Sequence, residues 1–277
     1  MKKIFQWCFV LILTTSVFAT PVRSNLGSRH VNYVQGEEGM PNPYVTDGLL
    51  AMWDGEWNVA VGIHSESTTV WKDISGNGND FLLKPDSFVW EDNAIFGLEG
   101  RTGSNICIGY MVTRVFGTIG TIECVANPGY GHDYESYVNG EILTGPYADG
   151  IIIVRPRGYA SRTICCILNQ SHGAPWYSKA GYGTRAIDMT VAFSSILEGT
   201  GTSAAYLNGS QISSYGYVVN SRNFDRISLG GRYDSYFRSE YYPYYGPIYC
   251  IRIYSRQLAA EEVAWNFALD KERFDIP

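Results

Sequence analysis

The sequence predicts an all-β fold of antiparallel strands with one short helix near the C-terminus. Short apolar runs recur at intervals of roughly 8–15 residues, separated by Gly, Asn, Asp and Pro. The runs are rich in β-branched and aromatic residues or alternate with polar ones, which is typical of strands. Asn139-Gly140 and Asn208-Gly209 lie between such runs, and Asn-Gly suits the type I′ turn of an antiparallel hairpin. Many antiparallel strands in one chain predict a sandwich or a barrel.

The expected strands follow one another along most of the chain, and no internal repeat interrupts them. With 277 residues the chain is long enough for one large domain or two small ones. The runs that carry the strand pattern are 48–53, 120–126, 150–154, 163–168, 187–193, 204–207, 226–229 and 248–254.

The segment 258–274 departs from the strand pattern and predicts the helix. Its apolar residues recur at i,i+4 spacing, acids stand near its start and bases near its end, as the helix dipole prefers. These residues are Val263 with Phe267, Trp265 with Leu269, Glu261 with Glu262, and Lys271 with Arg273. We expect the helix to dock on the edge of the sandwich.

The N-terminus has the layout of a secretory signal peptide, residues 1–19. Lys2 and Lys3 precede an apolar stretch from Ile4 to Leu13, and cleavage is expected near Ala19. A membrane anchor needs roughly 20 apolar residues, and neither this stretch nor any later one is that long. Residues 20–46 are polar and aperiodic and form a leader or linker, so the domain is expected at 47–277. The mature chain is expected to be secreted or held at the cell surface.

The composition argues against two classes of protein. The chain is 45% hydrophobic and 14% aromatic, which is too apolar for intrinsic disorder. Its formal net charge is −6 and it holds no run of like charges. Nucleic-acid binding draws most of its affinity from clustered Lys and Arg, so a nucleic-acid partner is not expected.

The cysteines allow two interpretations. Cys8 leaves with the signal peptide, and an odd number remains: Cys107, Cys124, Cys165, Cys166 and Cys250. In an oxidising compartment some of them would form disulfides, whose pairing the spacing does not give. Several lie in strand-like apolar runs, where a thiol acts as a small buried hydrophobe. No Cys-x-x-Cys pair and no histidine spacing points to a structural zinc site.

The tail 246–262 resembles the closing strand and helix of laminin G-like, concanavalin A-like jelly-roll domains. Five earlier pieces resemble the same family in the right order: 47–54, 71–80, 120–125, 205–209 and 227–231. Together they span about residues 47–272. The resemblance implies an antiparallel jelly-roll β-sandwich that binds glycans or proteins, while some relatives are glycoside hydrolases. Tyr249 replaces an Asp of the family, which weakens a calcium site there, and Ala259 replaces a helix-capping Ser or Thr.

The segment 73–80 is the stretch that most resembles a metal site. Oxygen-bearing side chains alternate around glycines there, as at the start of a calcium loop. The candidate ligands are Asp73, Asn77, Asn79 and Asp80. The position where a calcium loop has its bidentate Glu falls on Lys84. The alternative is a turn whose side chains bind their own backbone. Calcium is therefore an expected cofactor only on the first interpretation, and no other cofactor is expected.

The segment 230–245 is the strongest candidate for a ligand site. It combines flat aromatic rings, which stack on the apolar face of a sugar, with polar groups for hydroxyls. It lies between two expected strands, and loops of this length are often functional. The candidate residues are Arg232, Tyr233, Asp234, Tyr236, Tyr241 and Tyr244, with Trp176 in a second loop. The segment 130–134 is a further candidate, whereas Trp53, Trp57, Trp71 and Trp90 are expected in the core.

The sequence holds no catalytic motif. Jelly-roll glycanases place carboxylates on one face of a strand in E-x-D-x-x-E or a closely related spacing, and that spacing does not occur. Glu91 and Asp92 are adjacent and would point to opposite faces of a strand, and Glu123 has no second carboxylate two residues away. No nucleophile elbow, zinc-protease helix or nucleotide loop occurs either. An enzyme is not expected, although carboxylates from distant strands can converge in a fold.

These observations predict a secreted or cell-surface domain that binds a carbohydrate without changing it. The expected partner is an extracellular glycan or a surface protein, with no nucleic acid and no membrane span. The first alternative is a protein-interaction or adhesion module at the cell surface. The second is a glycoside hydrolase.

Overall fold

Two antiparallel sheets of eight strands each make up the fold. The computed structural model describes residues 44–98, 107–116, 119–127, 141–144, 150–157, 161–165, 180–182, 191–196, 202–216, 224–231 and 243–277. All of these fall within one compact unit, residues 31–277.

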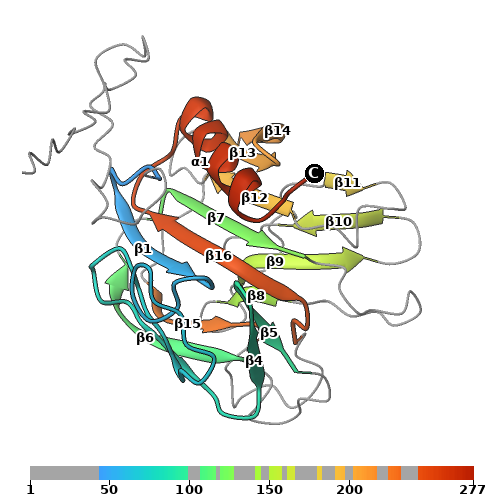
Figure 1. Ribbon diagram of the computed structural model, residues 1–277. Helices are drawn as coiled ribbons and strands as arrows, with labels where there is room; N and C mark the ends of the chain where they lie inside the picture. Colours follow the sequence, from blue (N-terminus) through green and yellow to red (C-terminus); the bar gives the residue numbers. More distant parts are fainter. Residues whose placement is uncertain are drawn as a thin grey trace, which may run out of the picture. The chain divides into compact units, whose positions relative to one another are not determined.

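Sheet I is built around a long strand near the C-terminus. Its strands are β1 (Leu49–Asp54), β4 (Phe88–Glu91), β5 (Ala94–Gly97), β7 (Thr121–Ala126), β12 (Val191–Ile196), β13 (Thr202–Leu207), β14 (Ser210–Gly216) and β16 (Pro247–Tyr254). Their order is β14-β13-β12-β7-β16-β5-β4, and β1 also pairs with β16 (Figure 1). Because β16 lies near the C-terminus and pairs with β1 near the start of the domain, strands from both ends of the domain lie side by side in sheet I.

Sheet II collects most of the middle of the chain. Its strands are β2 (Val70–Trp71), β3 (Phe81–Leu83), β6 (Gly109–Phe116), β8 (Glu141–Thr144), β9 (Gly150–Arg157), β10 (Ser161–Cys165), β11 (Ala180–Tyr182) and β15 (Phe224–Leu229). Their order is β11-β10-β9-β8-β15-β6-β3-β2. The strands β9, β10 and β11 thus lie at one end of the sheet, and β2 and β3 at the other.

The core lies between the two sheets. Trp53, Ile251 and Ile253 of sheet I and Phe81 and Ile227 of sheet II are fully buried in one apolar cluster. Because alternate side chains of a strand point to one face, each sheet contributes every second residue to this cluster. Burying one such side chain stabilises the fold by about 1.5–3 kcal/mol.

The four tryptophans predicted for the core are buried. Trp53, Trp57, Trp71 and Trp90 have 6% or less of their surface exposed. Three of the indole N–H groups donate to carbonyl oxygens of neighbouring loops: those of Asn79, Asp54 and Thr68. These tryptophans fill the core and also fix the loops that follow β1 and β2.

The predicted all-β fold with a C-terminal helix is confirmed. Strands occupy most of the predicted runs, for example β7 in 120–126 and β16 in 248–254. Asn208 and Gly209 join β13 to β14 with positive φ angles of 45° and 70°, as a type I′ turn requires. Asn139-Gly140 lies outside the described residues. The strands β3 and β5, of three and four residues, were not predicted, and neither was the eight-residue strand β6. The jelly-roll connectivity stays a prediction.

The helix α1 (Ala260–Arg273) packs on the face of sheet I that is turned away from the core (Figure 1). Its N-cap is Ala259, which has no polar side chain. The Glu262 carboxylate makes the other half of a capping box, since it accepts from the Ala259 N–H at 2.8 Å while pairing with Arg256. The predicted apolar face is found for Val263 and Leu269, whereas Trp265 is 42% exposed. Within the described part of the chain, no helix is long and apolar enough to cross a membrane.

Tyr44 and Val45, which the sequence assigns to the leader, are buried between α1 and sheet I. The Tyr44 hydroxyl donates to Asp270 at 2.8 Å, and its ring lies 4.2 Å from the Arg252 guanidinium carbon. The Val45 N–H donates to the Asn266 side-chain oxygen at 3.0 Å. The folded domain therefore includes residues on the N-terminal side of Asp47.

Three of the five cysteines expected in the mature chain can be placed with their side chains. Cys107, Cys124 and Cys250 are buried thiols. Burial raises the pKa of the Cys250 thiol well above its ordinary value. These three therefore follow the interpretation as small buried hydrophobes.

A chain that starts at Asp47 should be less stable than one that starts at Tyr44. We expect a loss of about 2–5 kcal/mol in the free energy of unfolding, because two buried side chains and their hydrogen bonds disappear. Urea unfolding of residues 44–277 and 47–277 measures the difference. In the longer chain, Tyr44→Phe keeps the ring and should lose about 1–2 kcal/mol only. Equal stability of the two truncations would show that Tyr44 and Val45 do not hold α1.

Candidate functional site

The tyrosine-rich segment is described at its two ends. Arg232, Tyr233, Asp234, Tyr236 and Tyr241 lie outside the described residues, as do Trp176 and the segment 130–134. Tyr244 is described and is only 3% exposed. Its hydroxyl donates to the carbonyl oxygens of Asn127 at 2.9 Å and Pro247 at 3.3 Å. Tyr244 therefore belongs to the core, where its ring offers no free face to a sugar, and this differs from the predicted role.

The two ends of the segment are joined to each other. The Tyr244 N–H donates to the Gly230 oxygen at 3.2 Å, and the Gly230 N–H donates to the Ile142 oxygen at 2.8 Å. Gly230 has a φ of 63°, and a Cβ there would lie 2.3 Å from the Ile108 side chain. Only glycine fits this position without strain, so the base of the segment is held tightly against the core.

Two further segments begin or end beside this base. Asn127, at the end of β7, donates its N–H to the Pro247 oxygen, and residues 128–140 lead from it to β8. The Ile108 N–H donates to the Leu229 oxygen, and residues 99–106 precede it. We call the residues Ile108, Asn127, Ile142, Gly230 and Tyr244 the anchor rim. Asn127, which precedes the segment 128–140, thus lies beside Tyr244, which follows the segment 232–242.

The predicted calcium ligands bind backbone groups of their own loop and of β1, and one of them pairs with Lys72. The Asp73 carboxylate accepts from the N–H groups of Met52, Ser75 and Asn79 at 2.9–3.0 Å. Asp80 accepts from the Asp73 N–H at 2.9 Å and pairs with Lys72. The amides of Asn77 and Asn79 both donate to the Leu50 oxygen.

This arrangement is that of a turn whose side chains bind its backbone. Among the described residues, no group of three or more His, Cys, Asp or Glu side chains is placed to hold a metal ion. Calcium binding stays a prediction.

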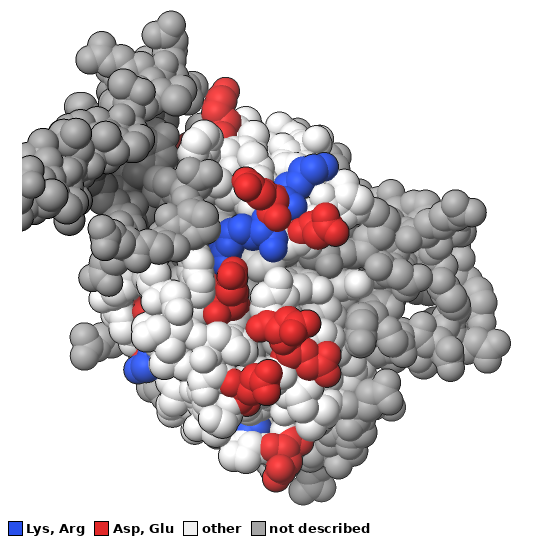
Figure 2. All heavy atoms as spheres, in the orientation of Figure 1, with Lys and Arg blue, Asp and Glu red and all other residues white. Residues whose placement is uncertain are grey.

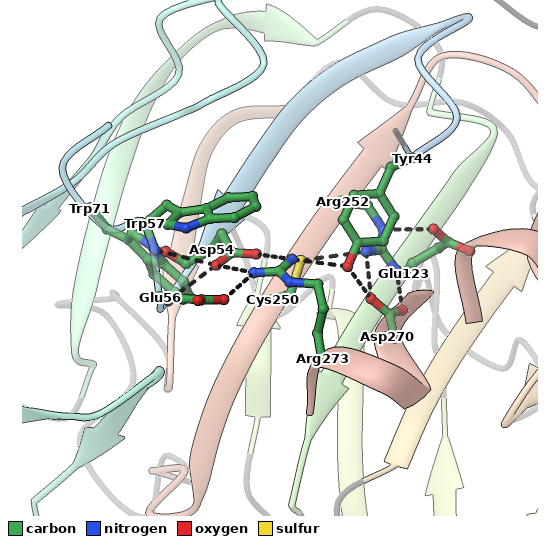
Figure 3. Close-up of polar contacts among 10 residues, drawn as sticks. All are labelled: Tyr44, Asp54, Glu56, Trp57, Trp71, Glu123, Cys250, Arg252, Asp270 and Arg273. Carbon is green, nitrogen blue, oxygen red and sulfur yellow. Dashed lines mark hydrogen bonds and ion pairs between the residues drawn. The ribbon is translucent and has the colours of Figure 1, made fainter. Parts of the chain in front are cut away.

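The most concentrated set of charged side chains lies under α1, and the sequence did not predict it. Arg252 of β16 is 1% exposed and is held between Glu123 of β7 and Asp270 of α1 (Figure 3). Its Nε donates to Glu123 at 2.8 Å and its Nη1 to Asp270 at 2.8 Å. Asn266 adds a donor to Glu123 at 2.7 Å. We call Glu123, Arg252, Asn266 and Asp270 the buried ion cluster.

A second pair of charges extends the buried ion cluster toward the end of β1 (Figure 3). The Arg273 guanidinium donates to both oxygens of Asp54, at 2.8 and 3.0 Å, and to Glu56 at 2.8 Å. It also lies over the Trp57 ring, 4.2 Å from the centroid. Asp54 is fully buried, whereas the Glu56 side chain is 49% exposed. The C-terminal end of α1 is thereby tied to β1.

Burial is the main influence on the pKa of two of these carboxyl groups. Removal from water raises the pKa of Glu123 above its ordinary 4.5, although Arg252 acts in the opposite direction. The pKa of Asp54 is raised above 3.8 for the same reason, against Arg273. A raised carboxyl pKa often marks a catalytic acid. Glu123 and Asp270 are, however, covered by α1 and bound to Arg252, so they offer no open face to a substrate. Their arrangement serves the packing of the helix.

The comparisons with known proteins agree with the fold and identify no family. A scan against protein families finds no match, and a search of curated proteins finds none either. Among solved structures, the chain is similar to a mutant of Trypanosoma rangeli sialidase displaying trans-sialidase activity, with a TM-score of 0.55 and 12% identity. The match covers 83% of this chain and 34% of the sialidase, so the chain spans about a third of that protein.

Two other solved structures are similar to a comparable degree. Domain 4 of AbnA, a GH43 extracellular arabinanase from Geobacillus stearothermophilus, in complex with arabinotriose, has a TM-score of 0.51 and 15% identity. That match covers 79% of this chain and 97% of the domain. The botulinum neurotoxin type G receptor binding domain has a TM-score of 0.50 and 13% identity, covering 81% of this chain and 52% of that one. At these identities the likeness shows the fold alone: an all-β domain of antiparallel sheets.

Arg252→Leu should destabilise the domain by about 3–5 kcal/mol, because it leaves Glu123 and Asp270 buried without their cation. Arg256→Gln is the matched control. Arg256 also pairs with a carboxylate, Glu262, but its side chain is 27% exposed, so we expect a loss of about 0–1 kcal/mol. Urea unfolding of both variants measures the two values. Similar losses in the two variants would mean that the buried ion cluster contributes no more to stability than an exposed ion pair does.

Glu123→Gln should change how stability depends on pH. Because the folded pKa of Glu123 is raised, the folded protein binds this proton more tightly than the unfolded chain does. Glu123 therefore contributes stability below its ordinary pKa and loses that contribution as the pH rises through the raised value. As the pH rises above 4.5, the free energy of unfolding should therefore decrease relative to that of the variant. Parallel pH curves would contradict this.

Proposed function

We propose that this chain is an exported, non-catalytic domain of jelly-roll type that binds an extracellular glycan at the anchor rim. The anchor rim carries the proposal, because its residues flank two segments whose sequences hold several tyrosines. Tyr130 and Tyr134 follow Asn127 along the chain, and Tyr236 and Tyr241 lie between Gly230 and Tyr244. Aromatic rings stack on the apolar faces of sugars, and a rigid base lowers the cost of ordering the segments that carry them.

Two further points support a binding role rather than catalysis. Two of the carboxylates that the fold brings together, Glu123 and Asp270, are buried and bound to Arg252. The arabinanase domain that resembles this chain was solved with arabinotriose bound. That likeness is an analogy of architecture, and architecture does not by itself fix function. A protein-interaction module and a glycoside hydrolase are therefore outcomes of the test below.

Binding of purified residues 20–277 to a broad glycan array tests the proposal. We expect saturable binding to one class of sugar and no release of sugar from the bound glycan. The array is run once with calcium and once with a chelator, and a loss of binding in chelator would support calcium at 73–80. Product release would show a hydrolase. Silence on both arrays would overturn the glycan proposal and favour a protein partner.

Tyr236→Ala with Tyr241→Ala should weaken glycan binding about 10- to 100-fold, because two rings that cover apolar sugar faces are lost. The matched control is Tyr236→Phe with Tyr241→Phe, which keeps both rings and should retain most of the affinity. Thermal unfolding of both double variants checks that the fold is intact. Unchanged affinity in the alanine variant would place the ligand elsewhere.

A further inference from the structure

The strand β1 has one side that no strand covers. Along its other side β1 pairs with β16, from Leu49 opposite Tyr254 to Asp54 opposite Cys250. In the part of the chain that the structure describes, β1 pairs with no further strand. An uncovered strand edge presents backbone N–H and C=O groups that can pair with the edge of another chain.

The sequence of β1 favours such pairing. The strand reads Leu-Leu-Ala-Met-Trp-Asp, and its one charged residue, Asp54, is fully buried. Segments that are apolar, nearly uncharged and free of proline pair readily with copies of themselves. Figure 2 shows acidic side chains spread over the face that carries α1. The exposed acids that flank β1 along the chain, Asp47 and Glu56, lie outside the strand. β1 itself therefore carries none of the exposed charges that protect many natural edge strands.

The loop that follows β2 supplies partners to the middle of this edge. The Met52 N–H donates to the Asp73 carboxylate at 3.0 Å, and the Met52 oxygen accepts from the Ile74 N–H at 2.8 Å. Both backbone groups of Met52 are therefore bound by the loop. In an antiparallel sheet, one residue exchanges two such bonds with a neighbouring strand. The loop thus takes the place of a strand at this point.

Two asparagine side chains cover the start of the edge. The Asn77 amide donates to the backbone oxygens of Leu49 and Leu50, both at 3.1 Å. The Asn79 amide donates to the Leu50 oxygen at 2.9 Å. These carbonyl groups are thereby occupied without a further strand. We call Asp73, Ile74, Asn77 and Asn79 the edge cover.

The edge cover is held firmly at its ends and weakly at its tip. Asp73 is buried, and the Asn79 oxygen accepts from the indole N–H of the core residue Trp53 at 2.9 Å. Asn77, by contrast, is exposed, so water competes for its hydrogen bonds. Local opening of a protein begins where contacts are few and hydrogen bonds are exposed to solvent. We expect the edge cover to open from Asn77 and to free the start of β1 first.

We propose that the edge cover keeps this domain monomeric by closing the β1 edge, and that a second copy pairs with β1 when the cover opens. The partner of the open edge is the same edge of the other copy, because two identical edges related by a two-fold axis can pair as antiparallel strands. Each copy then supplies the backbone groups that replace the side chains of the cover. This inference is independent of the proposed glycan ligand.

The variant Asn77→Ala with Asn79→Ala, made in residues 20–277, tests the inference. It removes three hydrogen bonds to oxygens of β1 and keeps Asp73. We expect the variant to dimerise at a protein concentration about tenfold or more below that of wild type, because each lost bond raises the open fraction several-fold. Analytical ultracentrifugation over a range of concentrations measures the association. Dimerisation of wild type and variant at the same concentration would overturn the proposal.

Amide hydrogen exchange locates the contact between the copies. In dilute solution, the peptide with residues 49–54 should exchange about tenfold faster in the variant than in wild type, because the Met52 N–H is freed each time the cover opens. Where the variant is dimeric, the protection of this peptide should return. Association that leaves residues 49–54 unprotected would place the contact elsewhere and would contradict pairing through β1.

The matched control removes side-chain hydrogen bonds that do not reach β1. The Asn58 side chain exchanges two hydrogen bonds with the Ser65 backbone, at 2.8 and 3.0 Å. Asn58→Ala should lower the thermal stability and leave the protein monomeric. If it associates as readily as the double variant, the effect is one of stability alone and the edge cover is overturned.

A single substitution decides the matter if the double variant unfolds early in a thermal scan. Asn77→Ala changes one exposed side chain, so the fold should persist. We expect dimers at a concentration about fivefold below that of wild type. Wild-type behaviour of this variant would also overturn the proposal.

Discussion

The structure of this domain depends on one buried cation. Arg252 lies on β16, the strand that pairs with β1, β5 and β7. Its partners, Glu123 and Asp270, are buried as deeply as it is. A charge removed from water is tolerated only when it is paired and hydrogen-bonded. α1 must therefore dock so that Asp270 reaches Arg252, and that docking also encloses Tyr44. The ion cluster thus fixes where both ends of the domain lie.

The docking of α1 on sheet I determines which part of this sheet is covered. Around β7 and β16, the face of sheet I turned away from the core is covered by α1, so its carboxylates hold the helix and meet no ligand. The proposed function therefore places the ligand-binding residues in loops. Gly230 and Tyr244, which flank one of these loops, are fixed by hydrogen bonds and close packing.

Local patterns predicted the fold class well, whereas they did not predict the buried ion cluster. Turn chemistry and strand composition located the Asn208-Gly209 hairpin, β16 and α1, because these signals act over a few residues. The buried ion cluster escaped prediction because Glu123 and Arg252 are 129 positions apart. The sequence does contain a signal for this cluster. Each of two apolar strands holds a single charged residue, an acid in Ile122-Glu123-Cys124 and a base in Ile251-Arg252-Ile253. Isolated charges of opposite sign in two buried strands should be expected to meet.

Tyr244 shows why aromatic richness alone does not define a binding site. The segment 230–245 is rich in aromatic rings, yet the Tyr244 ring near its C-terminal end is buried in the core. The Tyr244 hydroxyl binds the Asn127 oxygen at the base of the segment. The amino-acid composition of a loop does not distinguish an aromatic ring that packs in the core beneath the loop from one that is exposed on its surface.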